Sequence, residues 1–171
     1  MQRVFFALWP NEKVAQALHE AGRAAQKTCG GRLMRRDTLH MTLVFLGEVN
    51  AEQLDAACAA ADSVAGQPFE MVVDRSDCWR HNHIVWAGCL RTPPPLADLA
   101  DVLGRRLRDG GLSLEERLLV AHATLLRNAN CAAVPPPFAP IAWNVAEFVL
   151  VESRPAADGP HYRILRRWAL G

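Results

Sequence analysis

Apolar side chains near the start of the chain form a continuous run, then a helical pattern, then a second run. Residues 3–9 are mostly apolar or aromatic and stop at Pro10, which predicts a short buried strand. After Asn11, a predicted N-cap, apolar residues recur at helical intervals as far as Gly30, where glycine ends the predicted helix. The next apolar run, over residues 39–46, predicts a second strand.

The same patterns continue to the end of the chain. The remaining predicted elements are a helix over residues 51–65, strands over 69–76 and 83–90 joined by a turn near His81 and Asn82, a helix over 96–110, a strand over 120–127, and a closing antiparallel pair over 143–153 and 161–170. Strands and helices interleave in two similar rounds, and no low-complexity linker separates them. We therefore expect one domain over residues 1–171, an α+β unit of two lobes.

Composition and charge exclude some classes of protein. Half of the residues are hydrophobic and 22% are charged, which is typical of a globular chain and not of a disordered one. The net charge of +1 creates no general field, so any attraction for an anion must come from a local arrangement. Arginines do form local groups, each interpreted most simply as a solvated face: Arg32, Arg35 and Arg36; Arg105, Arg106 and Arg108; Arg163, Arg166 and Arg167.

The cysteines and the N-terminus bear on the compartment. The five cysteines are scattered and form no C-x-x-C pair, which favours reduced thiols over a disulfide framework or a zinc ribbon. The N-terminal apolar stretch is too short for a signal peptide, and no run approaches the roughly 20 apolar residues of a membrane span. We expect a cytoplasmic protein with no membrane partner.

Two apolar runs share the order H-x-T-L. In the run over residues 39–46, strand alternation places His40 and Thr42 on one face and the flanking apolar residues on the other. In the strand over 120–127, the same parity places His122 and Thr124 on one face. Each strand thus uses its apolar face for packing and presents an imidazole and a hydroxyl elsewhere, as a strand that lines a cleft does.

Chance is a poor explanation for the repetition. With six His and five Thr in 171 residues, H-x-T is expected about 0.2 times, yet it occurs twice. A histidine can take or give a proton near neutral pH, so two of them on opposite sides of one phosphorus can act as base and acid. A threonine hydroxyl beside each can donate to a phosphate oxygen. This set of groups suits a strained cyclic phosphodiester and requires no metal.

These motifs and their flanks resemble the 2H phosphoesterase superfamily, which is named for two H-x-T motifs. Within it the chain is similar to the RNA 2′,3′-cyclic phosphodiesterases, formerly called 2′-5′ RNA ligases. The likeness covers nearly the whole chain: RVFFALWP, TLHMTLVFLGEV, HIVWAGCL, AHATLLR, EFVLVESR and YRILRRWAL. The resemblance implies two antiparallel sheets related by a pseudo-twofold axis around a central cleft, with helices on the outer faces.

The resemblance also implies the residues of the site. His40 and His122 carry over as the catalytic pair, with Thr42 and Thr124 as substrate-binding residues. Arg127 stands where the family often has an arginine. Strict alternation would turn Arg127 away from the histidines, so a bend or bulge after Leu126 is required to bring it to the cleft. One departure is Ala121, where the family often has proline, which affects strand stiffness at most.

For the family, the implied reaction is hydrolysis of a terminal 2′,3′-cyclic phosphate to a 2′-phosphate. We expect His40 to protonate the leaving 3′ oxygen and His122 to activate water, although pseudo-symmetry allows the roles to exchange. The expected partner is RNA with a 2′,3′-cyclic phosphate terminus, or a cyclic nucleotide; the expected cofactor is none. The arginines from Arg32 to Arg36 lie where they either steer an RNA tail or remain solvated. The chain is expected to be a monomer.

Two other functions remain open. The first is a non-catalytic RNA- or nucleotide-binding relative, against which the intact H-x-T motifs argue. The second is a zinc hydrolase using His40, His122 and an acidic residue, although neither motif strand contains a carboxylate. His81 and His83 are spaced by two but have no third ligand nearby, so we expect an exposed turn there. Of Phe5 and Phe6, alternation sends one into the core and leaves the other to pack there or to reach the cleft.

Overall fold

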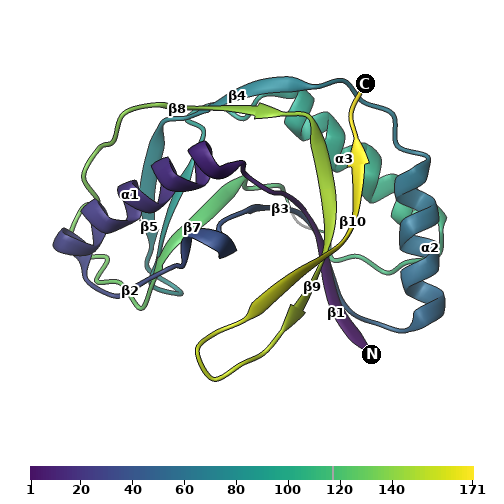
Figure 1. Ribbon diagram of the computed structural model, residues 1–171, viewed down its shortest axis with the longest axis horizontal. Helices are drawn as coiled ribbons and strands as arrows, with labels where there is room; N and C mark the ends of the chain where they lie inside the picture. Colours follow the sequence, from purple (N-terminus) through teal and green to yellow (C-terminus); the bar gives the residue numbers. More distant parts are fainter. Residues whose placement is uncertain (117) are drawn as a thin grey trace.

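The computed structural model describes residues 1–116 and 118–171. Within them the chain forms an eight-stranded antiparallel sheet, a two-stranded sheet and three α-helices (Figure 1), which confirms the expected α+β class. The strands are β1 (Gln2–Leu8), β2 (Arg32–Leu33), β3 (Met41–Val49), β4 (Phe69–Val73), β5 (Arg75–Trp79), β6 (Ile84–Gly88), β7 (His122–Arg127), β8 (Ile141–Val145), β9 (Glu147–Arg154) and β10 (His161–Ala169). The helices are α1 (Glu12–Cys29), α2 (Ala51–Asp62) and α3 (Pro94–Asp109), with a 3-10 turn η1 (Arg36–Thr38).

The large sheet consists of two halves. Its strand order is β10-β9-β1-β3-β7-β6-β5, with β2 paired to the side of β7. The first half, β10-β9-β1-β3, contains both ends of the chain, and the second half, β7-β6-β5, comes from the middle. Among the described residues the halves meet at one residue pair, Met41 opposite Ala123. The two H-x-T segments therefore lie next to each other across the join.

Capping residues mark the starts of α1 and α2 and the end of α1. The Asn11 side chain accepts a hydrogen bond from the amide of Val14 at 2.9 Å at the start of α1, and Gly30 ends that helix with a φ of 64°. Asn50 and Gln53 form a reciprocal capping box at the start of α2. In the described ranges no helix is long and apolar enough to cross a bilayer.

The helices cover the sheet on its outer side. Helix α1 contacts β7 of the second half, whereas α2 and α3 contact each other and β3 of the first half. In Figure 1, α1 accordingly lies on the left, α2 and α3 lie on the right, and the loop that joins β9 to β10 lies near the bottom of the view. The largest buried side chains include Phe6, Phe148, Leu18 and Leu103. Sheet and helices thus share one hydrophobic core, which fixes the two halves relative to each other.

Strand β1 has an aromatic residue on each face. Phe6 is fully buried in the main core, near Trp168. Phe5, on the opposite face, packs with Val149 and Val151 in a second, smaller cluster. The predicted alternation of Phe5 and Phe6 is confirmed, and Phe5 is the one that reaches the cleft.

Two predicted strands are divided in the structure. The segment over residues 69–76 breaks at Asp74, whose amide donates to the carbonyl of Gly88 and whose carboxylate accepts from the amide of Leu90. Consequently β4 leaves the large sheet and pairs with β8, while β5 stays and forms a hairpin with β6. The segment over 143–153 likewise divides into β8 and β9. The pattern of apolar positions along one segment carries no signal for such a change of sheet.

The expectation of five reduced cysteines was wrong. Cys78 in β5 and Cys131 in the loop after β7 form a disulfide, and their Cα atoms lie 5.4 Å apart. The two are separated by 53 residues, and spacing along the sequence does not reveal which cysteines meet in space. The free cysteines are Cys29, Cys58 and Cys89.

Candidate active site

A cleft of about 710 Å³ opens where the two halves of the large sheet meet. Its floor carries the side chains of both H-x-T segments, and the loop between β9 and β10 contributes part of its wall. The residues that line the cleft include Arg3, Phe5, Phe45, Glu48, Thr38, His40, Thr42, Trp79, His122, Thr124, Arg127, Gly159 and Tyr162.

All four H-x-T side chains reach this one cleft. His40 lies immediately before β3 and His122 is the first residue of β7. His40, Thr42, His122 and Thr124 are half-buried, whereas the residues that alternate with them are buried. The placement predicted from strand parity is therefore what the structure shows, and two imidazoles far apart in the sequence share one space.

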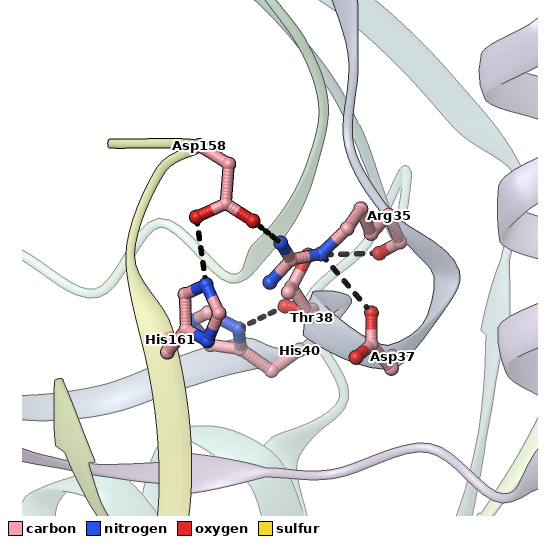
Figure 2. Close-up of polar contacts among 6 residues, drawn as sticks. All are labelled: Arg35, Asp37, Thr38, His40, Asp158 and His161. Carbon is pink, nitrogen blue, oxygen red and sulfur yellow. Dashed lines mark hydrogen bonds and ion pairs between the residues drawn. The ribbon is translucent and has the colours of Figure 1, made fainter. Parts of the chain in front are cut away.

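The two imidazoles are held in the same way. Nδ1 of His40 lies 2.7 Å from the carbonyl oxygen of Thr38 (Figure 2), and Nδ1 of His122 lies 2.7 Å from the carbonyl oxygen of Val120. A carbonyl oxygen only accepts, so each Nδ1 carries the proton and donates it. In the neutral ring Nε2 is then the unprotonated nitrogen, and across the described residues neither Nε2 has a protein partner. Each histidine thus has one nitrogen for orientation and one for chemistry.

His40 is enclosed by aromatic rings. The Trp9 ring stacks parallel to it at 5.1 Å, while Phe5 lies at 4.9 Å and the Tyr162 ring meets it edge-on at 5.1 Å between centroids. Burial among these rings lowers the pKa of His40 to about 4, because the charged form loses its hydration. The hydrogen bond to Thr38 opposes this shift but does not offset it. His40 is neutral at pH 7 in the free protein.

His122 has a related environment built from other segments. The rings of Trp79 and Trp86 meet it edge-on at 4.5 and 6.4 Å between centroids. Burial again lowers the pKa of His122, and the positive charge of Arg127 lowers it further. Burial therefore favours the neutral form of both imidazoles.

Arg127 reaches the cleft because β7 is irregular. Thr124 is opposite Trp86, but the next paired residue, Leu126, is opposite Val85, so Leu125 is an extra residue in the ladder. Leu125 and Leu126 are both buried, and Arg127 returns to the face of the histidines. We expected a bend or bulge after Leu126. The bulge lies one residue earlier, at Leu125, and likewise turns the Arg127 side chain toward the cleft.

A network of ion pairs holds the segment before His40. Arg35 contacts Asp37 at 3.4 Å and Asp158 at 3.0 Å, and Asp158 in turn accepts a 2.8 Å hydrogen bond from Nε2 of His161 (Figure 2). The His161 bond and the charge of Arg35 lower the pKa of Asp158. The network joins η1, which supplies the Thr38 carbonyl, to the β9–β10 loop that walls the cleft.

The sequence did not predict every residue of the site. Trp9, Tyr162 and Trp79 come from three distant segments, and no local pattern connects them to either histidine. Strand β3 also runs past the predicted 39–46 and brings Glu48 to the cleft, so the expectation that neither motif strand contains a carboxylate was wrong. The residue types are visible in the sequence, but their convergence depends on sheet order.

The metal-ligating side chains that the structure describes do not come together in one group. His81 and His83 are exposed in the turn between β5 and β6, as predicted. Within residues 1–116 and 118–171 no three His, Cys, Asp or Glu side chains are grouped as metal ligands. The cleft that holds the two histidines is lined by hydroxyls, aromatic rings, the guanidiniums of Arg3 and Arg127 and one carboxylate, that of Glu48. This arrangement is suited to binding an anion and moving protons on either side of it.

Comparison with known proteins adds to this geometry. Residues 8–86 match the family described as LigT-like phosphoesterases. The chain is 35% identical over 171 residues to the RNA 2′,3′-cyclic phosphodiesterase of Escherichia coli (strain K12), covering 99% of this chain and 97% of that protein. It is 30% identical to the protein of the same name from Thermus thermophilus, covering 98% and 90%. The crystal structure of E. coli LigT complexed with 3′-AMP superimposes with a TM-score of 0.89, at 32% identity, over 99% of this chain and 98% of that one.

Proposed function

The chain belongs to the LigT-like phosphoesterase family, and we propose that it hydrolyses the 2′,3′-cyclic phosphate ends of RNA or nucleotides to 2′-phosphates. The observation that carries the proposal is the shared cleft of His40 and His122, each oriented through Nδ1 with Nε2 left for a ligand. The activity named for the two relatives supports the choice of substrate.

The reaction is a substitution at phosphorus. One imidazole accepts a proton from water as the water oxygen bonds to phosphorus. The bond from phosphorus to the 3′ oxygen breaks, and the other imidazole, protonated beforehand, gives its proton to that oxygen. The products are a 2′-phosphate and a free 3′-hydroxyl, and the two imidazoles exchange protons with solvent to restore the starting state. We assign His40 as the acid and His122 as the base.

The neighbouring groups hold the anion. The hydroxyls of Thr42 and Thr124 donate to non-bridging phosphate oxygens, and the Arg127 guanidinium neutralises the charge that develops in the transition state. Bound phosphate also bears on the proton state, since its negative charge and its pairing with Arg127 oppose the effects that lower the pKa of each histidine. Binding of substrate thus favours the protonated acid that the reaction requires.

The direct test removes each imidazole separately. His40→Ala and His122→Ala are expected to lower turnover of a 2′,3′-cyclic nucleotide about a hundredfold or more without unfolding the protein. His19→Ala, on α1 outside the cleft, is the matched control and should leave turnover unchanged. The product is to be resolved as 2′- or 3′-phosphate. Near-native turnover of either cleft variant would refute the paired-histidine assignment.

A non-catalytic nucleotide-binding protein is the alternative. Both functions predict binding of a cyclic nucleotide, but only the enzyme opens the ring, so the appearance of a ring-opened product separates them. We further propose that the reaction needs no metal and that the protein acts as a monomer. Full turnover in EDTA and a single-chain mass in solution are the expected results, and loss of turnover that zinc restores would instead support a zinc hydrolase.

A further inference from the structure

Arg32 lies directly beside Arg127. The short strand β2 pairs with β7 so that Arg32 is opposite Arg127 and Leu33 is opposite Leu126. Directly opposed residues of an antiparallel pair project to the same face, so Arg32 stands on the face that Arg127 presents to the cleft. Arg32 is exposed and Arg127 half-buried. The Arg127 guanidinium therefore lies in the cleft, and the Arg32 guanidinium lies next to it at the rim.

The rest of the Arg32–Arg36 group is already neutralised. Arg35 pairs with Asp158 and Asp37 (Figure 2), while Arg36 donates to Gln16 and approaches Glu12 at 3.9 Å. The Arg32 guanidinium, in contrast, has no acidic or hydrogen-bonding partner in the part of the chain that the structure describes. Of the three arginines, Arg35 and Arg36 are thus paired within the protein, and Arg32 is available to bind an anion.

The position of Arg32 is also constrained by the loop that walls the cleft. Gly159 has a φ of +105°, and a Cβ built there would lie 2.9 Å from Nη1 of Arg32. The missing side chain lets the guanidinium lie against the cleft wall. Two like charges facing each other across a strand pair destabilise the sheet unless an anion lies near them. A polyanion entering past this rim relieves that repulsion.

We propose that Arg32 binds the phosphodiester preceding the cyclic end, so that the preferred substrate is an RNA strand and not a free cyclic nucleotide. The proposal rests on the cyclic phosphodiesterase function and extends it by one nucleotide. Arg127 serves the reacting phosphate and Arg32 serves its neighbour along the backbone. Because phosphate contacts carry no sequence information, this site selects for length and not for base.

The test compares one variant on two substrates. Arg32→Gln is expected to lower kcat/KM about tenfold on an oligoribonucleotide with a 2′,3′-cyclic phosphate end. On a 2′,3′-cyclic mononucleotide kcat/KM should not change. Losing one phosphate contact should also reduce the slope of log kcat/KM against log salt by about 0.7 for the oligonucleotide. Arg32→Lys should recover most of the loss, since it retains the charge.

Arg105→Gln is the matched control, because Arg105 is an exposed arginine on α3 outside the cleft lining. If Arg32→Gln slows both substrates equally, or leaves the oligonucleotide unaffected, the proposed subsite is refuted. If the wild-type protein converts neither substrate, the proposed activity fails instead. The subsite is then tested by binding of a 2′-phosphate-ended oligonucleotide, which must be weaker for Arg32→Gln than for the wild type.

Discussion

Met41 and Ala123 face each other as the antiparallel pair that joins the two halves of the sheet. Each is the central residue of an H-x-T segment, and both are buried. The spacing of this pair therefore sets the spacing of His40 and His122.

Enlarging Ala123 should separate the histidines. Ala123→Leu adds volume to a fully buried position at the join. We expect it to lower the free energy of unfolding by about 1–3 kcal/mol and to lower kcat/KM about a hundredfold, since a small misplacement of reacting groups costs that much. Ala57→Leu, at a fully buried site on α2, is the control for packing alone. Denaturant unfolding and turnover are measured on both, and equal losses of activity would contradict this role for the join.

The pH dependence of turnover follows from the lowered pKa values. In the proposed mechanism the reactive state has one imidazole neutral and one protonated. Both pKa values lie below 6.5 in the free protein, that of His40 at about 4. The bell-shaped profile of kcat/KM, which reports the free protein, should then have its maximum below about pH 6.5. A bound phosphate anion favours the charged form of each imidazole, so we expect it to raise both pKa values and to move the maximum of kcat to higher pH. Coincident maxima, or a kcat/KM that still rises above about pH 7, would contradict the assignment.

The disulfide should stabilise the wall beside His122. Cys78 precedes Trp79, which packs edge-on to His122, and the bond to Cys131 closes a separation of 53 residues. Cys131→Ser, or reduction of the wild type, is expected to lower the free energy of unfolding by about 2–5 kcal/mol. Cys58→Ser should have little effect, because Cys58 is a free cysteine. Thiol titration of the unreduced, denatured protein should detect three thiols; detection of five would contradict the pairing.

Local regularity explains what the sequence predicted correctly. Alternation along a strand was sufficient to place His40 with Thr42 and His122 with Thr124, because a two-residue period leaves one choice of face once the other face is apolar. Repetition of the motif then indicated that the strands act together. The order of the elements and the class of fold follow from the same short-range patterns.

Contacts between distant segments explain which features the sequence did not predict. The change of sheet at Asp74 depends on hydrogen bonds to Gly88 and Leu90, which lie well downstream. The bulge at Leu125 shows only in the register with β6, and the pairing of Cys78 with Cys131 depends on where β5 and the loop after β7 meet. The unpaired state of the Arg32 guanidinium likewise depends on which side chains surround it, and the local sequence does not distinguish it from Arg35 and Arg36.

The order of strands has a consequence for synthesis on the ribosome. Both H-x-T segments are translated before β9 and β10, yet these last strands complete the half that holds His40 and supply the Tyr162 ring against it. A nascent chain that has already exposed both histidines therefore still lacks one wall of the pocket. The enclosure of His40 is therefore completed only when the β9–β10 hairpin has left the ribosome, late in synthesis.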